Sequence, residues 1–199
     1  MTEFYTRQKH EVNDLKNTFI SGFYMKDLSI CDELIDYFEK SDKQREGTLG
    51  YNEVVKWAKD SVDVPVYLWE DIPVYNRYRK ELQEQLQNYI QQYPVLNVTS
   101  PWSINKPCNI QKYKPGGGFK KIHFERDSAD NSSRFLVFMT YLNDVKDGGG
   151  TKWINQDVEI KAEKGLTVFW PTEWTHTHVG VVSPTETKYI ITGWYNYND

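Results

Sequence analysis

The first half of the chain carries apolar residues at helical spacing. In residues 28–40 apolar side chains recur every three or four positions, which predicts an amphipathic helix. Residues 75–93 repeat this pattern over a longer stretch, and Pro94 ends it because proline cannot continue a helix. The polar stretch 41–52 between them contains two glycines and predicts a loop.

From about residue 98 the spacing of apolar residues falls from 3.6 to 2, which indicates strands. The predicted strands are 109–113, 119–126, 134–142, 151–154, 158–161, 166–170, 178–182 and 188–195. Many short strands at such intervals are typical of a sandwich, barrel or jelly roll. We therefore expect a single α+β domain over residues 1–199 with a mainly β core. In this organisation residues 1–97 are a mainly helical support packed on one sheet, and 98–199 form the core.

Composition excludes several classes of function. The 199 residues suit one domain, and 24 Lys+Arg against 28 Asp+Glu give a net charge of −4, which argues against a nucleic-acid partner. No apolar run is long enough to cross a membrane, and the N-terminus lacks the apolar core of a signal peptide, so we expect a cytoplasmic protein. Two cysteines cannot build a multi-thiolate zinc site.

The chemistry that stands out is a histidine and a carboxylate two residues apart. His123 and Glu125 lie on one predicted strand, and residues i and i+2 of a strand project from the same face. Asp127 is in phase with them and is a reserve carboxylate. Two histidines and one carboxylate form a facial triad that suits Fe(II) with open positions, although the ligand types also allow zinc.

The second histidine of such a triad has two candidates. His176 and His178 lie about 50 residues downstream, and they also share a face, so strand alternation does not choose between them. His10 stands apart in a polar segment, where we expect it to be solvated.

Four segments, in order, resemble the Fe(II)/2-oxoglutarate-dependent dioxygenases, and within them the prolyl 4-hydroxylase-like branch. The resemblance covers about residues 105–197, roughly half of the chain. The segments are Tyr113-Lys114-Pro115-Gly116-Gly117-Gly118 leading to His123-Phe124-Glu125, Arg134 through Tyr141-Leu142-Asn143, Gly149-Gly150-Thr151, and His178 through Lys188 to Trp194.

The resemblance implies a double-stranded β-helix, or jelly roll, and a ligand set. In this family the basic residue that binds the co-substrate follows the distal histidine by nine or ten positions, and Lys188 is ten after His178. The resemblance therefore assigns His123, Glu125 and His178 as metal ligands and catalytic residues. It leaves His176 as a neighbour at the rim or behind the ligands. The usual carboxylate of the family is aspartate, so Glu125 is a departure that bears on iron affinity and geometry.

The resemblance also implies a co-substrate site for 2-oxoglutarate. The residues it assigns to this site are Lys188, Tyr141 and Tyr113. Thr192 and Trp194 share the strand face of Lys188 by alternation, so they are further candidates for lining the same pocket. Lys188 would supply the charge for the far carboxylate and Tyr141 a hydroxyl donor. Arg134 and His176 are candidate substrate-binding residues, and Arg134 alternatively makes a structural salt bridge.

The implied reaction hydroxylates an unactivated C–H bond while 2-oxoglutarate is decarboxylated to succinate and CO2. Its cofactor is Fe(II), its co-substrates are 2-oxoglutarate and O2, and ascorbate would keep the iron reduced. The substrate is an unknown peptide, with peptidyl proline as the nearest match, or a small molecule. The alternatives are a nucleic-acid demethylase, which the net charge disfavours, and a non-catalytic jelly-roll module that binds metal or ligand through a degenerate site.

Overall fold

One large antiparallel sheet organises the molecule. The computed structural model describes residues 17–49 and 53–198, so His10 lies outside the described residues. In this sheet β5 (Trp102–Ser103) pairs with β13 beside the main path. Along that path the order is β1 (Ser21–Tyr24), β11 (Leu166–Pro171), β8 (Arg134–Tyr141), β13 (Lys188–Tyr197), β6 (Cys108–Tyr113), β4 (Val62–Val66) and β2 (Arg45–Glu46).

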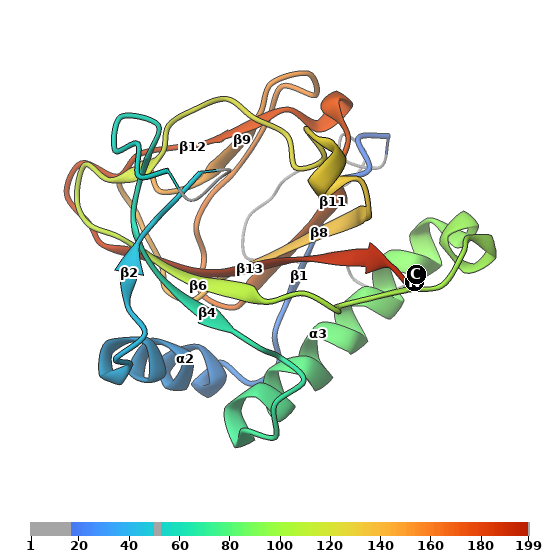
Figure 1. The fold of residues 1–199 in the computed structure, drawn as a ribbon, viewed down its shortest axis with the longest axis horizontal. Coiled ribbons are helices and arrows are strands. Elements are labelled where there is room, and N and C mark those ends of the chain that lie inside the picture. Colours follow the sequence, from blue (N-terminus) through green and yellow to red (C-terminus); the bar gives the residue numbers. More distant parts are fainter. Residues whose placement is uncertain (1–16, 50–52, 199) are drawn as a thin grey trace.

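Two smaller sheets complete the β core. The first has the order β10 (Val158–Ile160), β9 (Thr151–Trp153) and β12 (His178–Gly180). The second pairs β3 (Lys59–Asp60) with β7 (Gly118–Phe119). Figure 1 shows β9 and β12 facing the large sheet from one side, while the helices cover its other side. The predicted fold class, a jelly roll with helices packed on one sheet, is confirmed.

Both predicted helices form, and each buries one apolar stripe. α2 (Ser29–Lys40) buries Ile30, Cys31, Leu34 and Phe38. α3 (Pro73–Gln92) begins with proline, whose missing N–H costs nothing in the first turn, and buries Tyr75, Tyr78, Leu82, Leu86 and Tyr89 among others. Three short 3-10 helices, η2 (Pro94–Val98), η3 (Ala129–Asn131) and η4 (Trp174–His176), lie in connections. No helix in the described ranges is both long and apolar enough to cross a membrane.

The large sheet separates two hydrophobic cores, because side chains along a strand point alternately to its two faces. On β8, Phe138 belongs to the core under α2 and α3, whereas Val137 and Met139 belong to the core between the sheets. On β13, Ile191 and Tyr195 face the helices. The intervening residues of β13 therefore point into the space between the sheets, where a site can form.

The first half contributes more strand than the sequence predicts. Beside α2 and α3, residues 1–97 supply β1, β2 and β4 to the large sheet and β3 to the two-stranded sheet, four strands that the sequence pattern did not predict. The sequence pattern does not predict β4, because it contains Pro65 and a proline has no N–H to donate to a neighbouring strand. In the structure Pro65 pairs only with Asn109 of β6, and β2 reaches no further than Asp63, so the proline sits where one side of β4 is free.

The close packing behind β13 can be tested at Gly193. A Cβ added there would lie 2.5 Å from Cys108 Sγ and 2.8 Å from Phe138 Cζ, and neither atom has room to move away. We expect Gly193→Ala to lower the free energy of unfolding by about 1–3 kcal/mol through overpacking, measured by urea denaturation. The control is Gly22→Ala, whose Cβ meets only the flexible end of Leu166 at 3.0 Å. Equal stability of both variants would contradict the prediction.

Candidate active site

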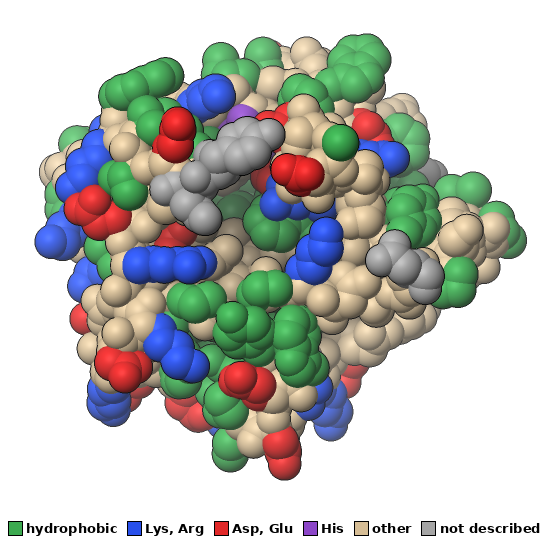
Figure 2. Space-filling model, viewed as in Figure 1, with side chains coloured by type: hydrophobic (Ala, Val, Ile, Leu, Met, Phe, Trp, Pro, Cys, Tyr) green, Lys and Arg blue, Asp and Glu red, His purple; other side chains and the backbone are tan. Residues whose placement is uncertain are grey.

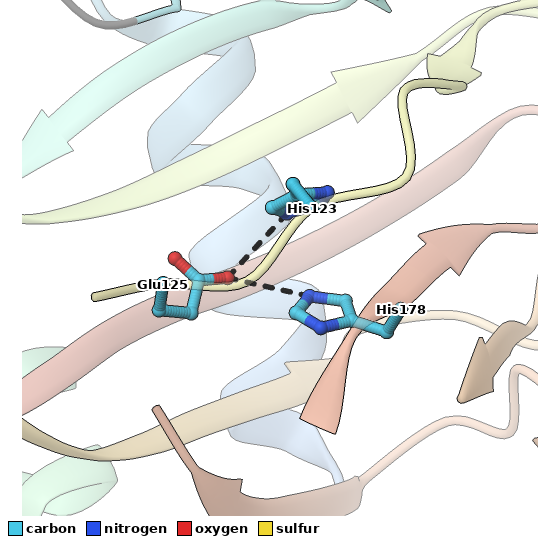
Figure 3. A group of neighbouring side chains, drawn as sticks. All are labelled: His123, Glu125 and His178. Carbon is cyan, nitrogen blue, oxygen red and sulfur yellow. Dashed lines mark ion pairs between the residues drawn. The ribbon is translucent and has the colours of Figure 1, made fainter. Parts of the chain in front are cut away.

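Three side chains from distant parts of the chain converge between the sheets. His123, Glu125 and His178 offer ligand atoms that lie within 4.8 Å of one another. Glu125 Oε1 is 3.5 Å from His123 Nε2 and 3.3 Å from His178 Nε2, so a single carboxylate oxygen faces both rings (Figure 3). Among the described residues this is the one group of histidines, cysteines and carboxylates arranged to hold a metal ion.

Two backbone hydrogen bonds bring the histidines together. The amide of His123 donates to the carbonyl of His178 at 3.0 Å, and the amide of His178 donates back at 2.8 Å. His178 opens β12, but His123 forms only an isolated bridge, since β7 ends at Phe119. The strand predicted over 119–126 is therefore wrong in its extent. His123 and Glu125 still project together because the Glu125 amide donates to Thr172 O at 3.1 Å.

The backbone also decides which ring nitrogens face the cluster. His123 Nδ1 donates to Lys121 O at 2.9 Å, and His178 Nδ1 donates to His176 O at 2.9 Å. In a neutral imidazole with a proton on Nδ1, Nε2 carries only a lone pair. Two such lone pairs and a carboxylate then face each other with no donor between them, an arrangement that a divalent metal cation relieves. The donor set thus fits the expected iron.

Glu125 is held on its far side as well. Trp194 Nε1 donates to Glu125 Oε2 at 3.0 Å, and Arg134 Nη1 donates to the Glu125 carbonyl at 2.7 Å. The Arg134 guanidinium carbon lies 3.7 Å from the centre of the Trp194 ring. Burial raises the pKa of the Glu125 carboxyl, but in the metal-free protein hydrogen bonds and positive charge from His123 and His178 in their protonated form hold this pKa well below its usual value. A bound metal cation would supply that positive charge when the two rings are neutral.

A cavity of about 470 Å³ opens beside the three side chains. Figure 2 shows the molecule hollowed on this face, with apolar side chains inside and charged side chains around the rim. One wall is β13, which contributes Lys188, Ile190, Thr192 and Trp194 at alternate positions. The lining also includes surface residues, among which Arg45, Asp127, Ser128 and Asp130 are exposed, so the cavity opens to solvent near these residues, which we call its mouth.

Lys188 is buried in this cavity without an anionic partner. Its side chain is 5% exposed, and its Nζ lies over the Tyr113 ring, 4.9 Å from the centre. No ion pair or hydrogen bond to Nζ is found among residues 17–49 and 53–198. Burial lowers the pKa of Lys188 to about 8, because the protein offers no charge to compensate the ammonium. A carboxylate from a bound molecule would supply that compensation.

A buried ion pair that also lines the cavity was not found from the sequence. Lys59 Nζ lies 2.5 Å from Asp63 Oδ2, and both side chains are 6% exposed. Gln111 Nε2 donates to the same carboxylate at 3.3 Å, and its Oε1 accepts from the Tyr113 hydroxyl at 2.7 Å. Tyr113 is thus linked to Lys59 through Asp63 and Gln111, all four of which line the cavity. Nothing in the pattern of β3 and β4 signals this chain.

The other expected co-substrate residues have different positions. Thr192 lines the cavity, but its hydroxyl donates to Phe138 O at 3.0 Å. Tyr141 is fully buried and is not part of the cavity wall; its hydroxyl bonds the hydroxyl of Thr151 at 2.8 Å. Thr151 does line the cavity, so Tyr141 reaches it only through that threonine.

His176 lies away from the three converging side chains. Its Nε2 donates to Thr18 O at 2.8 Å and its Nδ1 accepts from the Thr175 hydroxyl at 3.0 Å, so both ring nitrogens are used. It therefore ties the segment before β1 to η4. Asp127, the reserve carboxylate, lies at the cavity mouth and does not belong to the group of three.

The comparison with protein families finds a match. Residues 108–196 match the model of the 2OG-Fe(II) oxygenase superfamily, and this range contains β6, β8, all of β13 but its last residue, and all three converging side chains. The search of curated protein sequences finds no match.

Solved structures with the same fold cover nearly the whole chain. A Pseudomonas putida prolyl-4-hydroxylase is 17% identical, with 94% of this chain and 97% of that chain covered and a TM-score of 0.69. A viral collagen prolyl hydroxylase from Paramecium Bursaria Chlorella virus-1 is 17% identical, with 90% and 97% covered and a TM-score of 0.67. A Trichoplax adhaerens prolyl hydroxylase, solved with a hypoxia inducible factor peptide fragment, is 17% identical, with 93% and 86% covered and a TM-score of 0.72.

Metal binding by the three side chains can be tested without any substrate. We expect Mn(II) or Co(II) at about 100 times its Kd to stabilise the protein by about 2.7 kcal/mol, seen as a rise in melting temperature. His178→Ala should abolish this rise. His176→Gln should keep it, measured against its own metal-free melting temperature, because His176 lies outside the cluster. Loss of the rise in His176→Gln but not in His178→Ala would reverse the assignment.

Proposed function

We propose that the protein is a 2OG-Fe(II) oxygenase that hydroxylates a peptidyl proline, since residues 108–196 match the model of that superfamily. Two features of one cavity carry the proposal. The first is the cluster of His123, Glu125 and His178, and the second is the unpartnered ammonium of Lys188. Together they suit a metal ion and a dicarboxylate in the same enclosed space.

The three converging side chains would hold Fe(II) through two imidazole nitrogens and one carboxylate oxygen. The bound iron supplies the oxidation of 2-oxoglutarate by O2 to succinate and CO2 and the coupled hydroxylation of a C–H bond. The protein supplies position and a dry environment. Trp170 packs against the His178 ring at 5.2 Å and, with Met139 and Ile190, gives the cavity apolar walls that exclude water.

Lys188 would bind the far carboxylate of 2-oxoglutarate. A buried charge without a partner is costly, and an incoming carboxylate pairs with it where little water competes. Thr151 stands in the same cavity with a hydroxyl that Tyr141 orients, and Tyr113 lies under the ammonium. These residues would fix the orientation of the co-substrate relative to the metal.

The proposal of a proline substrate is supported by the fold and by the cavity mouth. The similar solved structures are prolyl hydroxylases, and one of them carries a peptide. Here the cavity lining includes residues of two surface segments, 45–49 and 127–131, and an extended peptide would contact these segments while one of its side chains enters the cavity. We extend the proposal to ascorbate as reductant. We also propose a reducing compartment such as the cytoplasm, since Cys31 and Cys108 are free and buried.

The hydroxylase activity has a direct test. Protein supplied with Fe(II), 2-oxoglutarate, ascorbate and air should form succinate, and a proline-containing peptide should gain the mass of one oxygen atom in mass spectrometry. Under anaerobic conditions Fe(II) and 2-oxoglutarate together should give a weak visible charge-transfer band that His178→Ala lacks. A wild-type protein with neither the band nor succinate formation would show that the activity is absent. A band and succinate without peptide hydroxylation would exclude only the proline substrate.

Lys188 makes the affinity for 2-oxoglutarate depend on pH. The free protein holds Lys188 at a pKa of about 8, and pairing with a carboxylate raises it, so binding requires the charged form. Affinity should be full below pH 8 and fall up to about tenfold per pH unit above it, measured calorimetrically with Mn(II)-loaded protein. In Lys188→Arg the guanidinium stays charged and the fall should disappear, whereas Lys188→Met should bind weakly at every pH. A flat wild-type profile would contradict this role.

A further inference from the structure

The two oxygens of the Glu125 carboxylate have separate partners. Oε1 faces the two imidazoles, while Oε2 accepts a hydrogen bond from Trp194 Nε1 at 3.0 Å and lies 3.5 Å from Arg134 Nη1. We propose that Trp194 and Arg134 are positioning residues that fix a glutamate, and not a shorter carboxylate, as the third ligand. The inference rests on the proposed function only in taking this cluster as a metal site.

The backbone of Glu125 cannot shift to compensate for a change in side-chain length. Its amide donates to Thr172 O at 3.1 Å, and its carbonyl accepts from Arg134 at 2.7 Å. With both main-chain groups held, the reach of the carboxylate depends on the side chain alone. Removing one methylene withdraws both oxygens by about 1.5 Å, the length of one C–C bond. The shorter carboxylate can then keep either the indole or the position beside the histidines, but not both.

The indole donor is itself fixed in place. Trp194 lies on β13 opposite Val137 of β8, and the Arg134 guanidinium stacks on its ring at 3.7 Å. A cation over an indole face is an attractive contact, and it lies beside the negative charge of Glu125. Arg134 therefore acts twice, by holding the Glu125 carbonyl and by holding the ring that donates to Glu125 Oε2.

This hydrogen bond is not a general property of the tryptophans in the core. Trp153 and Trp170 are also buried near His178, with ring centres 6.1 and 5.2 Å from it, yet neither indole N–H has a partner among the described residues. The Trp194 N–H is the one directed at a carboxylate. With Oε2 so occupied, Glu125 presents a single oxygen to the metal position, and the remaining side of the site faces the cavity.

A double-mutant cycle on metal affinity tests the proposal without any turnover. The variants are Trp194→Phe, Glu125→Asp and the double substitution, and the readout is the Kd for Co(II) by calorimetry together with its visible absorption spectrum. Loss of an outer partner of a metal ligand typically weakens metal binding by 10–100-fold. We expect a loss of this size for Trp194→Phe in the wild-type background. In the Glu125→Asp background the shorter carboxylate that binds the metal no longer reaches the indole, so the same substitution should cost almost nothing.

The cycle has a matched control and distinguishable outcomes. Trp153→Phe removes an unpartnered indole N–H that lies near His178 but outside the cavity lining, so Co(II) affinity and spectrum should stay at wild-type values. Urea denaturation of each metal-free variant checks that it folds, and Arg134→Lys, which keeps the charge but loses the planar stacking group, is a second way to loosen Trp194. Wild-type affinity in both Trp194→Phe and Arg134→Lys, or losses that multiply in the double variant, would overturn the proposal. A wild-type protein that binds no metal would instead overturn the proposed function.

Discussion

The site depends on one short antiparallel bridge between residues 55 positions apart in the chain. The amides and carbonyls of His123 and His178 exchange two hydrogen bonds, and these are the only ladder contacts between the two segments in the described structure. They fix the separation of the two rings, and the same backbone directs both Nδ1 atoms at carbonyl oxygens. Position and tautomer are thus set by main-chain groups, whose geometry varies little with the side chains around them.

Around this bridge the protein distributes charge unevenly. Glu125 is negative and accepts a hydrogen bond from the Trp194 indole, and Lys188 is positive and has no acceptor among the described residues, whereas Lys59 and Asp63 neutralise each other. The free protein tolerates the unsatisfied Lys188 in a cavity that would otherwise favour apolar groups. Such local instability is typical of binding sites, where it is relieved by the ligand and not by the fold.

The features that follow from strand alternation could be predicted from the sequence. Lys188, Thr192 and Trp194 share a face because they are separated by even numbers of positions, and the structure places all three on the cavity wall. Long-range side-chain contacts could not be predicted in this way. The Lys59–Asp63 pair joins β3 to β4 across a turn, Trp194 reaches Glu125 from 69 positions away, and Tyr141 bonds Thr151 instead of opening into the cavity. The choice between His176 and His178 likewise depended on family resemblance, because two residues that are two positions apart project from the same face of a strand.

The two faces of β13 have different roles. Lys188, Ile190, Thr192 and Trp194 face the cavity, whereas Ile191, Gly193 and Tyr195 pack toward the helices. Since the alternation has a period of two, inserting or deleting a single residue near the start of the strand would exchange these faces. Lys188 would then point into the hydrophobic core beside the helices, and the cavity would lose its ammonium group. An insertion or deletion of one residue in β13 would therefore disrupt both the hydrophobic core and the cavity. Substitutions within β13, or changes in the surface segments at the cavity mouth, leave this alternation intact.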